Sequence, residues 1–168
     1  IKVIYNIYYM AGILPVAYYR NKVYFLFGRE TKDVNNKQAG QWSDFGGTRE
    51  KGETLFQTAV REGYEETDGI FGDERAIEQL IENNQIEVMN QGKYKIYMVM
   101  VPYKKELPKK FRLRYKKAKK DNIKLITEHN GLYEKDMIRW FTIDSLKKNI
   151  NDFRPWYRGV IRKLIRRF

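Results

Sequence analysis

Residues 46–70 read GGTREKGETLFQTAVREGYEETDGI, and the rest of the chain is arranged around this stretch. It begins as a glycine-broken loop and continues into a predicted helix over residues 54–67. Within this helix Glu62, Glu65 and Glu66 recur at i, i+3 and i+4, so their carboxylates project from one face within about one turn. The apolar side chains fall on a separate arc that would face the core, and Glu53 stands where the loop meets the helix.

Three like charges on one helical turn repel each other by about a few tenths of a kcal/mol per pair. No lysine or arginine follows any of these glutamates at a distance of four residues. A hard divalent cation would remove the repulsion, because carboxylate oxygens suit Mg²⁺ or Mn²⁺, ions that keep waters and bridge to substrate phosphates. The pattern therefore favours a metal site over a solvated acidic face.

Six positions of this stretch resemble the Nudix box, the signature of the Nudix hydrolase family: Gly47, Glu53, Arg61, Glu62, Glu65 and Glu66. Two positions depart from the family pattern. Gly63 stands where the family prefers a bulky aliphatic residue, and the closing Gly69 comes one residue late. We expect the first departure to loosen the packing under the helix and the second to alter its C-terminal cap. Neither removes a charged group.

The resemblance implies a fold and an activity. The fold is α/β, a Nudix-type α-β-α sandwich with a mixed, largely antiparallel central sheet and a C-terminal amphipathic helix. The activity is Mg²⁺- or Mn²⁺-dependent hydrolysis of a phosphate anhydride in a nucleoside diphosphate linked to another moiety. The metal ligands would be Glu62 and Glu66, with Glu65 as a third ligand or as the residue that positions water, and a carbonyl of Gly46 or Gly47 would add another.

The resemblance also implies supporting roles. Arg61 would hold Glu53 by a charge-assisted hydrogen bond. The general base stays open, because the family places it variously. Glu65 is one candidate, and the other is an acid from a later loop, which is Glu128, Glu134 or Asp136.

Composition limits the other possibilities. The chain has 168 residues, no Cys and one His, so it lacks the material for disulfides, thiolate zinc sites or a Cys-His nucleophile. We expect one domain over residues 1–168 and a cytoplasmic location, in the host cell if the protein is viral. Residues 1–19 are apolar but interrupted, so we expect strand rather than a leader or membrane span, with the native N-terminus missing before Ile1.

The net charge of +12 is concentrated in two segments. Residues 104–124 hold eleven Lys or Arg against two acids, and residues 151–168 hold six against one. This distribution is typical of a surface that faces a polyanion. The first segment is interpreted as a basic insertion outside the common core. Its alternating aromatic residues fit a strand and its charge density fits a surface helix, so both readings stay open.

The remaining elements follow from hydrophobic periodicity and turn residues. The predictions are a strand over 3–19 with Pro15 at an edge or bulge, a hairpin partner over 23–27, a mobile loop over 28–40, a short helix over 73–83, a hairpin of 85–89 with a central strand over 94–103, a late strand over 134–141, a helix that starts at 142–144, and an amphipathic helix over 153–168.

The charge distribution indicates which class of substrate the protein binds. A long polyanion suits two basic segments better than a small nucleotide does, and the chain is also similar, more weakly, to Nudix decapping enzymes of large DNA viruses. Capped RNA is therefore the leading substrate, ahead of an inositol pyrophosphate or a small nucleotide. A non-catalytic RNA-binding module is the alternative from another class, although such a module needs no carboxylate cluster. The expected substrate-binding residues are Trp42 (unless it packs in the core), Phe45, Lys116, Lys117, Lys119 and Lys120.

Overall fold

The computed structural model describes residues 9–128 and 131–168. Its strands are β1 (Met10–Tyr19), β2 (Lys22–Glu30), β3 (Trp42–Ser43), β4 (Phe45–Thr48), β5 (Gln85–Gln91), β6 (Tyr94–Met100) and β7 (Lys135–Phe141). Its helices are α1 (Leu55–Glu66), α2 (Glu74–Asn84), α3 (Leu107–Asp121), α4 (Lys124–Thr127), α5 (Ile143–Asn149) and α6 (Arg158–Arg167), with short 3₁₀ turns η1 (Ile150–Asp152) and η2 (Pro155–Tyr157) before α6. The predicted strand residues 3–8 and the single histidine, His129, lie outside the described residues. Within the described part, no helix has the length and apolarity that crossing a membrane requires.

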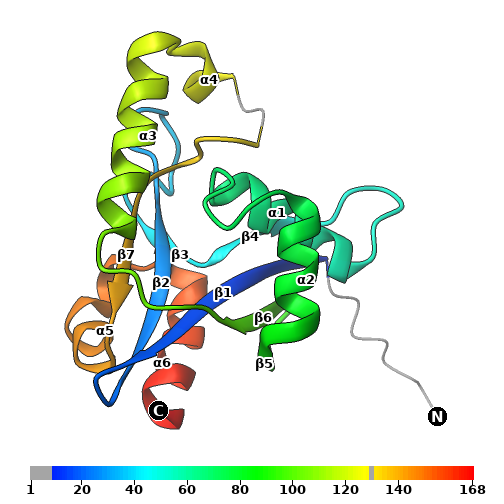
Figure 1. Cartoon of the computed structure of the whole chain (residues 1–168), viewed down its shortest axis with the longest axis vertical. Helices are drawn as coiled ribbons and strands as arrows, with labels where there is room; N and C mark the ends of the chain where they lie inside the picture. Colours follow the sequence, from blue (N-terminus) through cyan, green and yellow to red (C-terminus); the bar gives the residue numbers. More distant parts are fainter. Residues whose placement is uncertain (1–8, 129–130) are drawn as a thin grey trace.

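The strands form one mixed sheet in the order β3-β2-β1-β6-β5, with β4 also paired to β1 and β7 to β2 (Figure 1). Among the pairings in the described residues, β1–β6 is parallel and the other five are antiparallel. This confirms the predicted mixed, largely antiparallel sheet. The position predicted for Pro15 was wrong, because it lies inside β1. The pairing of β1 with β4 ends at Ile13 and that with β2 begins at Val16, so Pro15 falls where β1 exchanges one neighbour for another.

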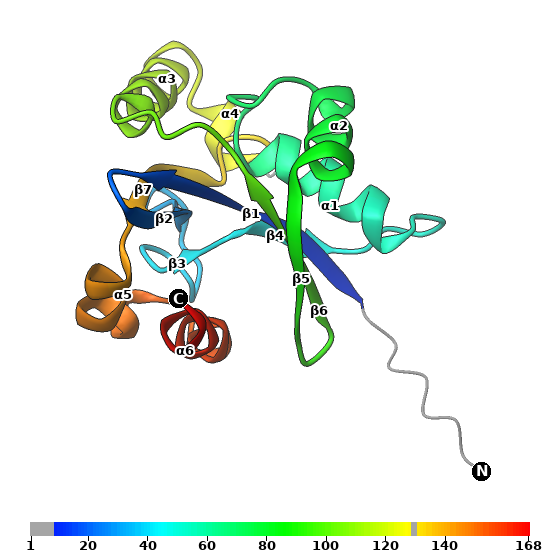
Figure 2. The ribbon, with the colours of Figure 1, turned by 60° about the horizontal axis from the view of Figure 1, so that its bottom comes forward.

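Helices cover both faces of the sheet, which confirms the predicted α-β-α sandwich (Figure 2). One core contains side chains of α1, α2 and α3, including Val60, Ile77 and Phe111. The other lies under α5 and α6 and includes Leu146 and Ile161. The two cores follow from the alternation of the strands, which sends successive apolar side chains to opposite faces.

Three predicted boundaries were wrong. Residues 28–30 belong to β2 and are not loop, because they pair with β3 and β7. The strand predicted to reach residue 103 ends at Met100. The C-terminal helix begins only at Arg158, since Arg154 is extended (φ −47°, ψ 132°). A residue before proline is biased away from helical backbone angles, and Pro155 follows it.

The basic segment folds as the helix α3, which decides between the two open interpretations. Leu107, Phe111, Tyr115 and Ala118 are its buried residues, and this spacing of four, four and three is helical. Leu113, which made the pattern look alternating, is 56% exposed. The helix packs against β7 and turns its lysines outward.

We had expected Gly63 to loosen the packing under α1, but the structure shows that it does not. A Cβ atom at this position would lie 2.9 Å from Cδ1 of Ile13 and 3.1 Å from Cγ2 of Ile77. The glycine therefore allows α1 to approach β1 and α2 closely. The altered cap is present, because Asp68 adopts a positive φ of 51° before Gly69 with a φ of 65°.

Candidate active site

A cavity of about 540 Å³ lies between α1, β4, the segment before β7 and the turn before α6. Carboxylates dominate its lining: Glu30, Glu50, Glu62, Glu65, Glu66 and Glu134. Gly46, Gly47, Arg61, Arg154 and Trp156 also line it. The structure thus brings together most of the residues predicted for catalysis and metal binding, and it places Glu53 behind them, in contact with Arg61.

The start of α1 is set by a capping box. The Oγ1 atom of Thr54 accepts from the backbone N–H of Gln57, and Oε1 of Gln57 accepts from the N–H of Thr54. These two bonds satisfy N–H groups that the first helical turn leaves unpaired. The next turns of α1 run past β4, where a Cβ atom at Gly47 would lie 2.5 Å from Oε1 of Glu62. A side chain at position 47 would therefore displace the carboxylate of Glu62.

Arg61 holds Glu53 as predicted. Its Nε donates to Oε1 of Glu53 at 2.7 Å and its Nη2 to Oε2 at 3.2 Å. The hydrogen bond from Arg61 lowers the pKa of the Glu53 carboxyl to about 2. The remaining Nη1 donates to Glu62 at 2.9 Å and to Glu65 at 3.0 Å. One guanidinium therefore orients three carboxylates.

Glu66 is held by a lysine that the sequence analysis missed. The Lys135 Nζ atom lies 2.8 Å from Oε1 of Glu66 and 3.0 Å from Oε2 of Glu30. The backbone N–H of Gly46 donates to the other oxygen of Glu66 at 2.6 Å, and Arg154 pairs with Glu30. Lys135 is fully buried.

Alternation along β7 gave no signal for this lysine. Arg139 shares its phase and is exposed, and the register of β7 against β2 shifts between Met137 and Lys135. Buried lysines are rare without a carboxylate partner. The sequence does not say which of many acids that partner is.

The donor set fits a divalent cation, which the family implies. Three carboxylates project from one helical turn into the cavity, and the pKa of Glu62 is raised to about 8 because it is buried beside Glu66. Within residues 9–128 and 131–168, no three such side chains already converge on one metal position. Arg61 donates to Glu62 and Glu65, and Lys135 pairs with Glu66. Glu62, Glu65 and Glu66 would hold the ion.

Several predicted site residues lie elsewhere. Trp42 packs in the core against Phe141, with ring centroids 5.2 Å apart, and Phe45 is fully buried in the other core. Neither lines the cavity, so both predicted substrate contacts were wrong; each residue is in the inward phase of a short strand. Asp136 accepts a forked pair of bonds from Arg29 at 2.8 and 3.0 Å.

The other predicted residues outside the cavity are exposed. Glu128 ends α4 and lies near Lys124. The four lysines predicted to bind substrate lie on α3, outside the cavity lining: Lys116, Lys117, Lys119 and Lys120. Of the candidates for general base, Glu65 and Glu134 are the ones that the cavity contains.

An acidic cavity on a glycine-broken strand, beside a helix of an α-β-α sandwich, is typical of a hydrolase that acts on phosphate anhydrides. The chain belongs to the Nudix family: the family model described as NUDIX domain matches residues 16–164.

Individual relatives are more distant. The chain is similar to the Ap4A hydrolase of C. elegans in a binary complex, with a TM-score of 0.53 and 16% identity over 92% of this chain and 94% of that one. It is also similar to a bifunctional NMN adenylyltransferase/ADP ribose pyrophosphatase from Francisella tularensis, with a TM-score of 0.49 and 18% identity over 97% of this chain and 43% of that one. An uncharacterized protein, L534, of Acanthamoeba polyphaga mimivirus is 40% identical over 62 residues, 36% of this chain and 20% of its own length. This chain thus matches about a fifth of that viral relative.

Proposed function

We propose that this Nudix hydrolase removes the cap from RNA, with Mg²⁺ or Mn²⁺ as its cofactor. The observation that carries the proposal is the outward face of α3. Eight of its fifteen residues, 107–121, are Lys or Arg, and the other seven are four buried positions, Pro108, Leu113 and Asp121. This charge exceeds what a small nucleotide needs. A strand of RNA supplies one phosphate per nucleotide, and its condensed counterions are released on binding.

In this reaction a water oxygen adds to one phosphorus of the cap's triphosphate bridge. The P–O bond to the next phosphate breaks, and the leaving oxygen keeps the electron pair. A bound divalent ion would neutralise charge that develops on the phosphoryl oxygens and would lower the pKa of a bound water. Glu62, Glu65 and Glu66 would hold that ion.

The remaining residues of the cavity position these groups. Arg61 keeps Glu62 and Glu65 in place, and Lys135 does the same for Glu66. Glu65 or Glu134 takes the proton of the attacking water, because both carboxylates line the cavity. Trp156 is 37% exposed at the cavity wall and offers an aromatic edge to the cap base.

A substrate panel tests the proposal. The protein is incubated with Mg²⁺ or Mn²⁺ and capped RNA, an inositol pyrophosphate, ADP-ribose or nucleoside triphosphates, with the Glu66→Gln variant as the control for contaminating activity. We expect capped RNA, labelled in the cap, to release a nucleoside diphosphate fastest. Turnover of the inositol pyrophosphate or ADP-ribose without release from capped RNA would refute decapping and leave the family activity standing.

A further inference from the structure

Four aromatic side chains form a cluster on the sheet face that α1 and α2 leave uncovered near the β1–β2 turn. Tyr103 stacks on Tyr19, with centroids 4.8 Å apart and planes 16° apart. It also contacts Tyr24 at 4.5 Å and Trp140 at 5.4 Å. Tyr19 is 40% exposed, so the cluster presents ring surface to solvent. We call these four residues the tyrosine platform.

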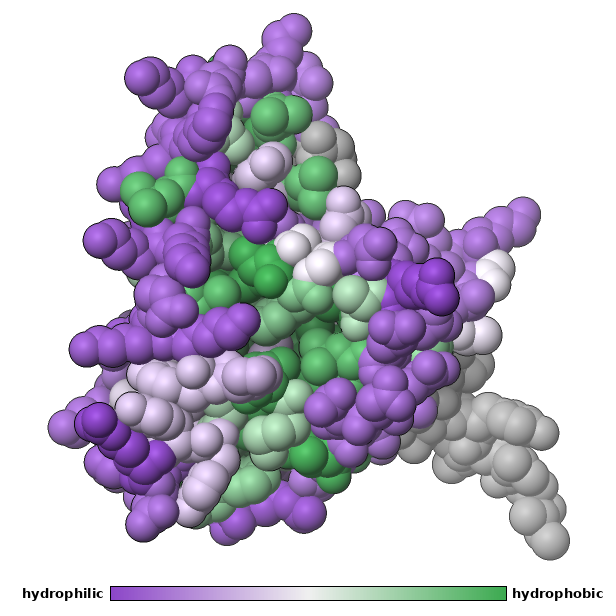
Figure 3. Space-filling view, viewed as in Figure 1, coloured by the Kyte–Doolittle hydropathy of each residue, from purple (hydrophilic) through white to green (hydrophobic). Residues whose placement is uncertain are grey.

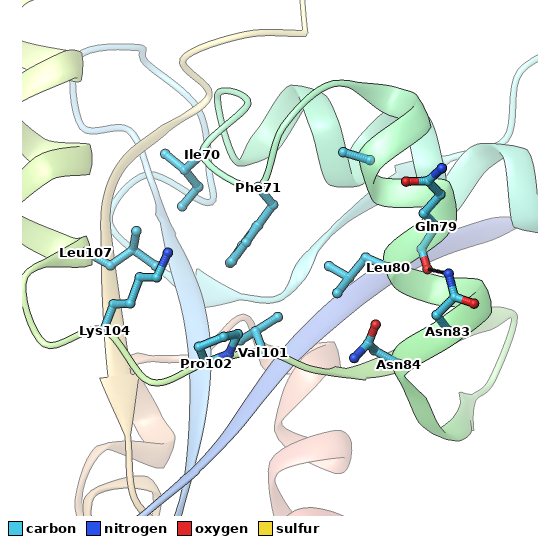
Figure 4. A pocket seen from close by; sticks show the side chains of 11 residues that line it. Ile70, Phe71, Gln79, Leu80, Asn83, Asn84, Val101, Pro102, Lys104 and Leu107 are labelled. Carbon is cyan, nitrogen blue, oxygen red and sulfur yellow. Dashed lines mark hydrogen bonds between the residues drawn. The ribbon is translucent and has the colours of Figure 1, made fainter.

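A pocket of about 360 Å³ adjoins the tyrosine platform (Figure 4). Phe71, Leu80 and Val101 line it, and Gln79, Asn83 and Asn84 line its α2 side. Figure 4 shows Nδ2 of Asn83 donating to the backbone carbonyl of Gln79. Pro102 and Lys104 of its lining flank Tyr103 in the chain, and the carbonyl of Lys104 accepts from Nε1 of Trp140 at 3.0 Å. The pocket and the platform are therefore neighbours along residues 102–104, and side chains of both pack against the core under α1 and α2. Figure 3 shows hydrophobic side chains at the centre of this view, between hydrophilic flanks.

The chemistry of the surface selects a ligand. The platform is aromatic, and exposed cations surround it: Arg20, Lys22, Lys104 and Lys105. The guanidinium of Arg20 lies 5.2 Å from the centroid of the Tyr19 ring. Stacked rings beside positive charge suit bases joined by phosphates, whereas a purely apolar partner would leave the cations unmatched.

We propose that the tyrosine platform and the adjoining pocket bind single-stranded RNA. Bases stack on Tyr19 and its neighbours, the surrounding cations contact the phosphates, and one unstacked base enters the pocket, where amide groups hydrogen-bond its edge. This inference rests on the proposed function in one respect: the strand bound here is the body of the capped substrate. It adds a binding surface outside the active-site cavity.

Binding of an uncapped, unstructured RNA of about 12 nucleotides, without metal, tests the proposal through fluorescence anisotropy. Tyr19→Ala should weaken binding about ten-fold, since stacking is worth about 1–3 kcal/mol per base. Tyr18→Ala is the matched control, because Tyr18 is 61% exposed and points to the opposite face of β1. Equal losses in the two variants, or no loss in either, would overturn the platform.

A second pair of variants keeps the test valid if Tyr19→Ala unfolds. Lys104→Ala/Lys105→Ala should weaken binding and reduce the slope of log Kd against log salt by about one unit per lost phosphate contact. Lys147→Ala/Lys148→Ala removes an equal charge from α5, whose buried Leu146 packs in the other core. Equal slopes for the two pairs would overturn the proposal.

The pocket has its own readout. Asn84→Ala should change the order of affinities among oligo-A, -C, -G and -U, whereas Tyr19→Ala should lower all four, since stacking tolerates any base. If the order of affinities is the same in Asn84→Ala as in the wild type, the pocket does not bind a base. Because these assays use uncapped RNA, binding without cap release would refute the proposed function alone, and cap release without binding at the platform would refute this inference alone.

Discussion

Arg61 is the residue around which the carboxylates of α1 are ordered. The forked contact to Glu53 uses two nitrogens of the guanidinium, and the third contacts Glu62 and Glu65. A fifth bond, from Nη2 to the carbonyl of Thr48 at 3.0 Å, ties the arrangement to β4. The planar fork, and not the charge alone, determines this geometry.

Arg61→Ala should therefore lower kcat/KM by about 10- to 100-fold, the usual cost of losing a residue that orients metal ligands, and should lower Tm. Arg61→Lys should restore little of either quantity, because an ammonium group cannot reproduce a forked contact. Steady-state kinetics and thermal unfolding of the two variants provide the measurement. Full rescue by lysine would show that Arg61 acts through net charge only.

Glu66 gives a second prediction, and here the structure changes the expectation drawn from the sequence. Repulsion on the helix suggested that Glu66→Gln would relieve α1 slightly. Glu66 is 3% exposed and pairs with Lys135, so the substitution should instead cost about 1–3 kcal/mol of unfolding free energy, as well as abolish turnover while leaving RNA affinity nearly unchanged.

Lys135→Met in the Glu66→Gln background provides the control for that cost. If the pair is the cause, the two substitutions will be less destabilising together than the sum of each alone, by about 0.5–3 kcal/mol. Chemical denaturation of the two single variants and the double variant measures these unfolding free energies. Strict additivity would mean that Glu66 and Lys135 do not stabilise each other, and retained turnover would remove Glu66 from the metal site.

At the scale of elements, the position of α1 depends on its close approach to β1. The absence of a side chain at Gly63 permits that approach. We predict that Gly63→Val destabilises the protein by about 1–3 kcal/mol, as overpacking of a core does, although valine suits a helix better than glycine. Ile13→Ala in the same background should recover part of the loss. Unchanged stability of Gly63→Val would show that the interface between α1 and β1 is loosely packed.

The helix α3 is fastened to the loop after β2 through Asp33. Lys119 donates to Oδ1 of Asp33 at 2.6 Å and Tyr115 to Oδ2 at 2.8 Å. The hydrogen bond from Lys119, with a smaller one from Tyr115, lowers the pKa of the Asp33 carboxyl below 3.8.

A group with a depressed folded-state pKa contributes stability above its unfolded pKa and loses it as the pH falls through the folded value. The stability difference between the wild type and Asp33→Asn should therefore be constant at neutral pH and shrink below about pH 4. Urea unfolding across this range checks the prediction. A difference that grows on acidification would contradict it.

For the whole molecule, the lysines of α3 and the acidic cavity lie on separate elements. The cavity belongs to α1, β4 and the segment before β7, and the lysines belong to α3. Two of these lysines already have partners, because Lys117 pairs with Asp121 and Lys119 with Asp33. Substrate contact through α3 is thus expected chiefly from Lys116 and Lys120.

Neutralising Lys116, Lys117, Lys119 and Lys120 together should weaken binding of long capped RNA. It should also flatten the salt dependence by up to about one unit of slope per lost phosphate contact. Hydrolysis of a free cap dinucleotide should barely change, because that substrate is too short to reach α3. Equal losses on both substrates would instead indicate a compact polyphosphate held by these lysines.

Local patterns in the sequence were enough to predict the helix at residues 54–67 and the shared face of Glu62, Glu65 and Glu66, because residues within about one helical turn contact each other by spacing alone. The pairing of Arg61 with Glu53 was implied by the resemblance to the Nudix box. The sheet was also predictable in outline, since a continuous apolar run marks a strand buried on both faces and alternation marks one buried on a single face. One domain over residues 1–168 and a cytoplasmic location stay predictions.

Only the tertiary structure decided which distant residues meet. Lys135 reaches Glu66 and Glu30 across the sheet, and Trp42 and Phe45 face opposite cores instead of the cavity. It also decided that α3 is a helix, because Leu107, Phe111 and Tyr115 become one face only when β7 is there to bury them. Spacing determines which side chains share a face, but pairing between strands and helices far apart in the chain determines what that face contacts.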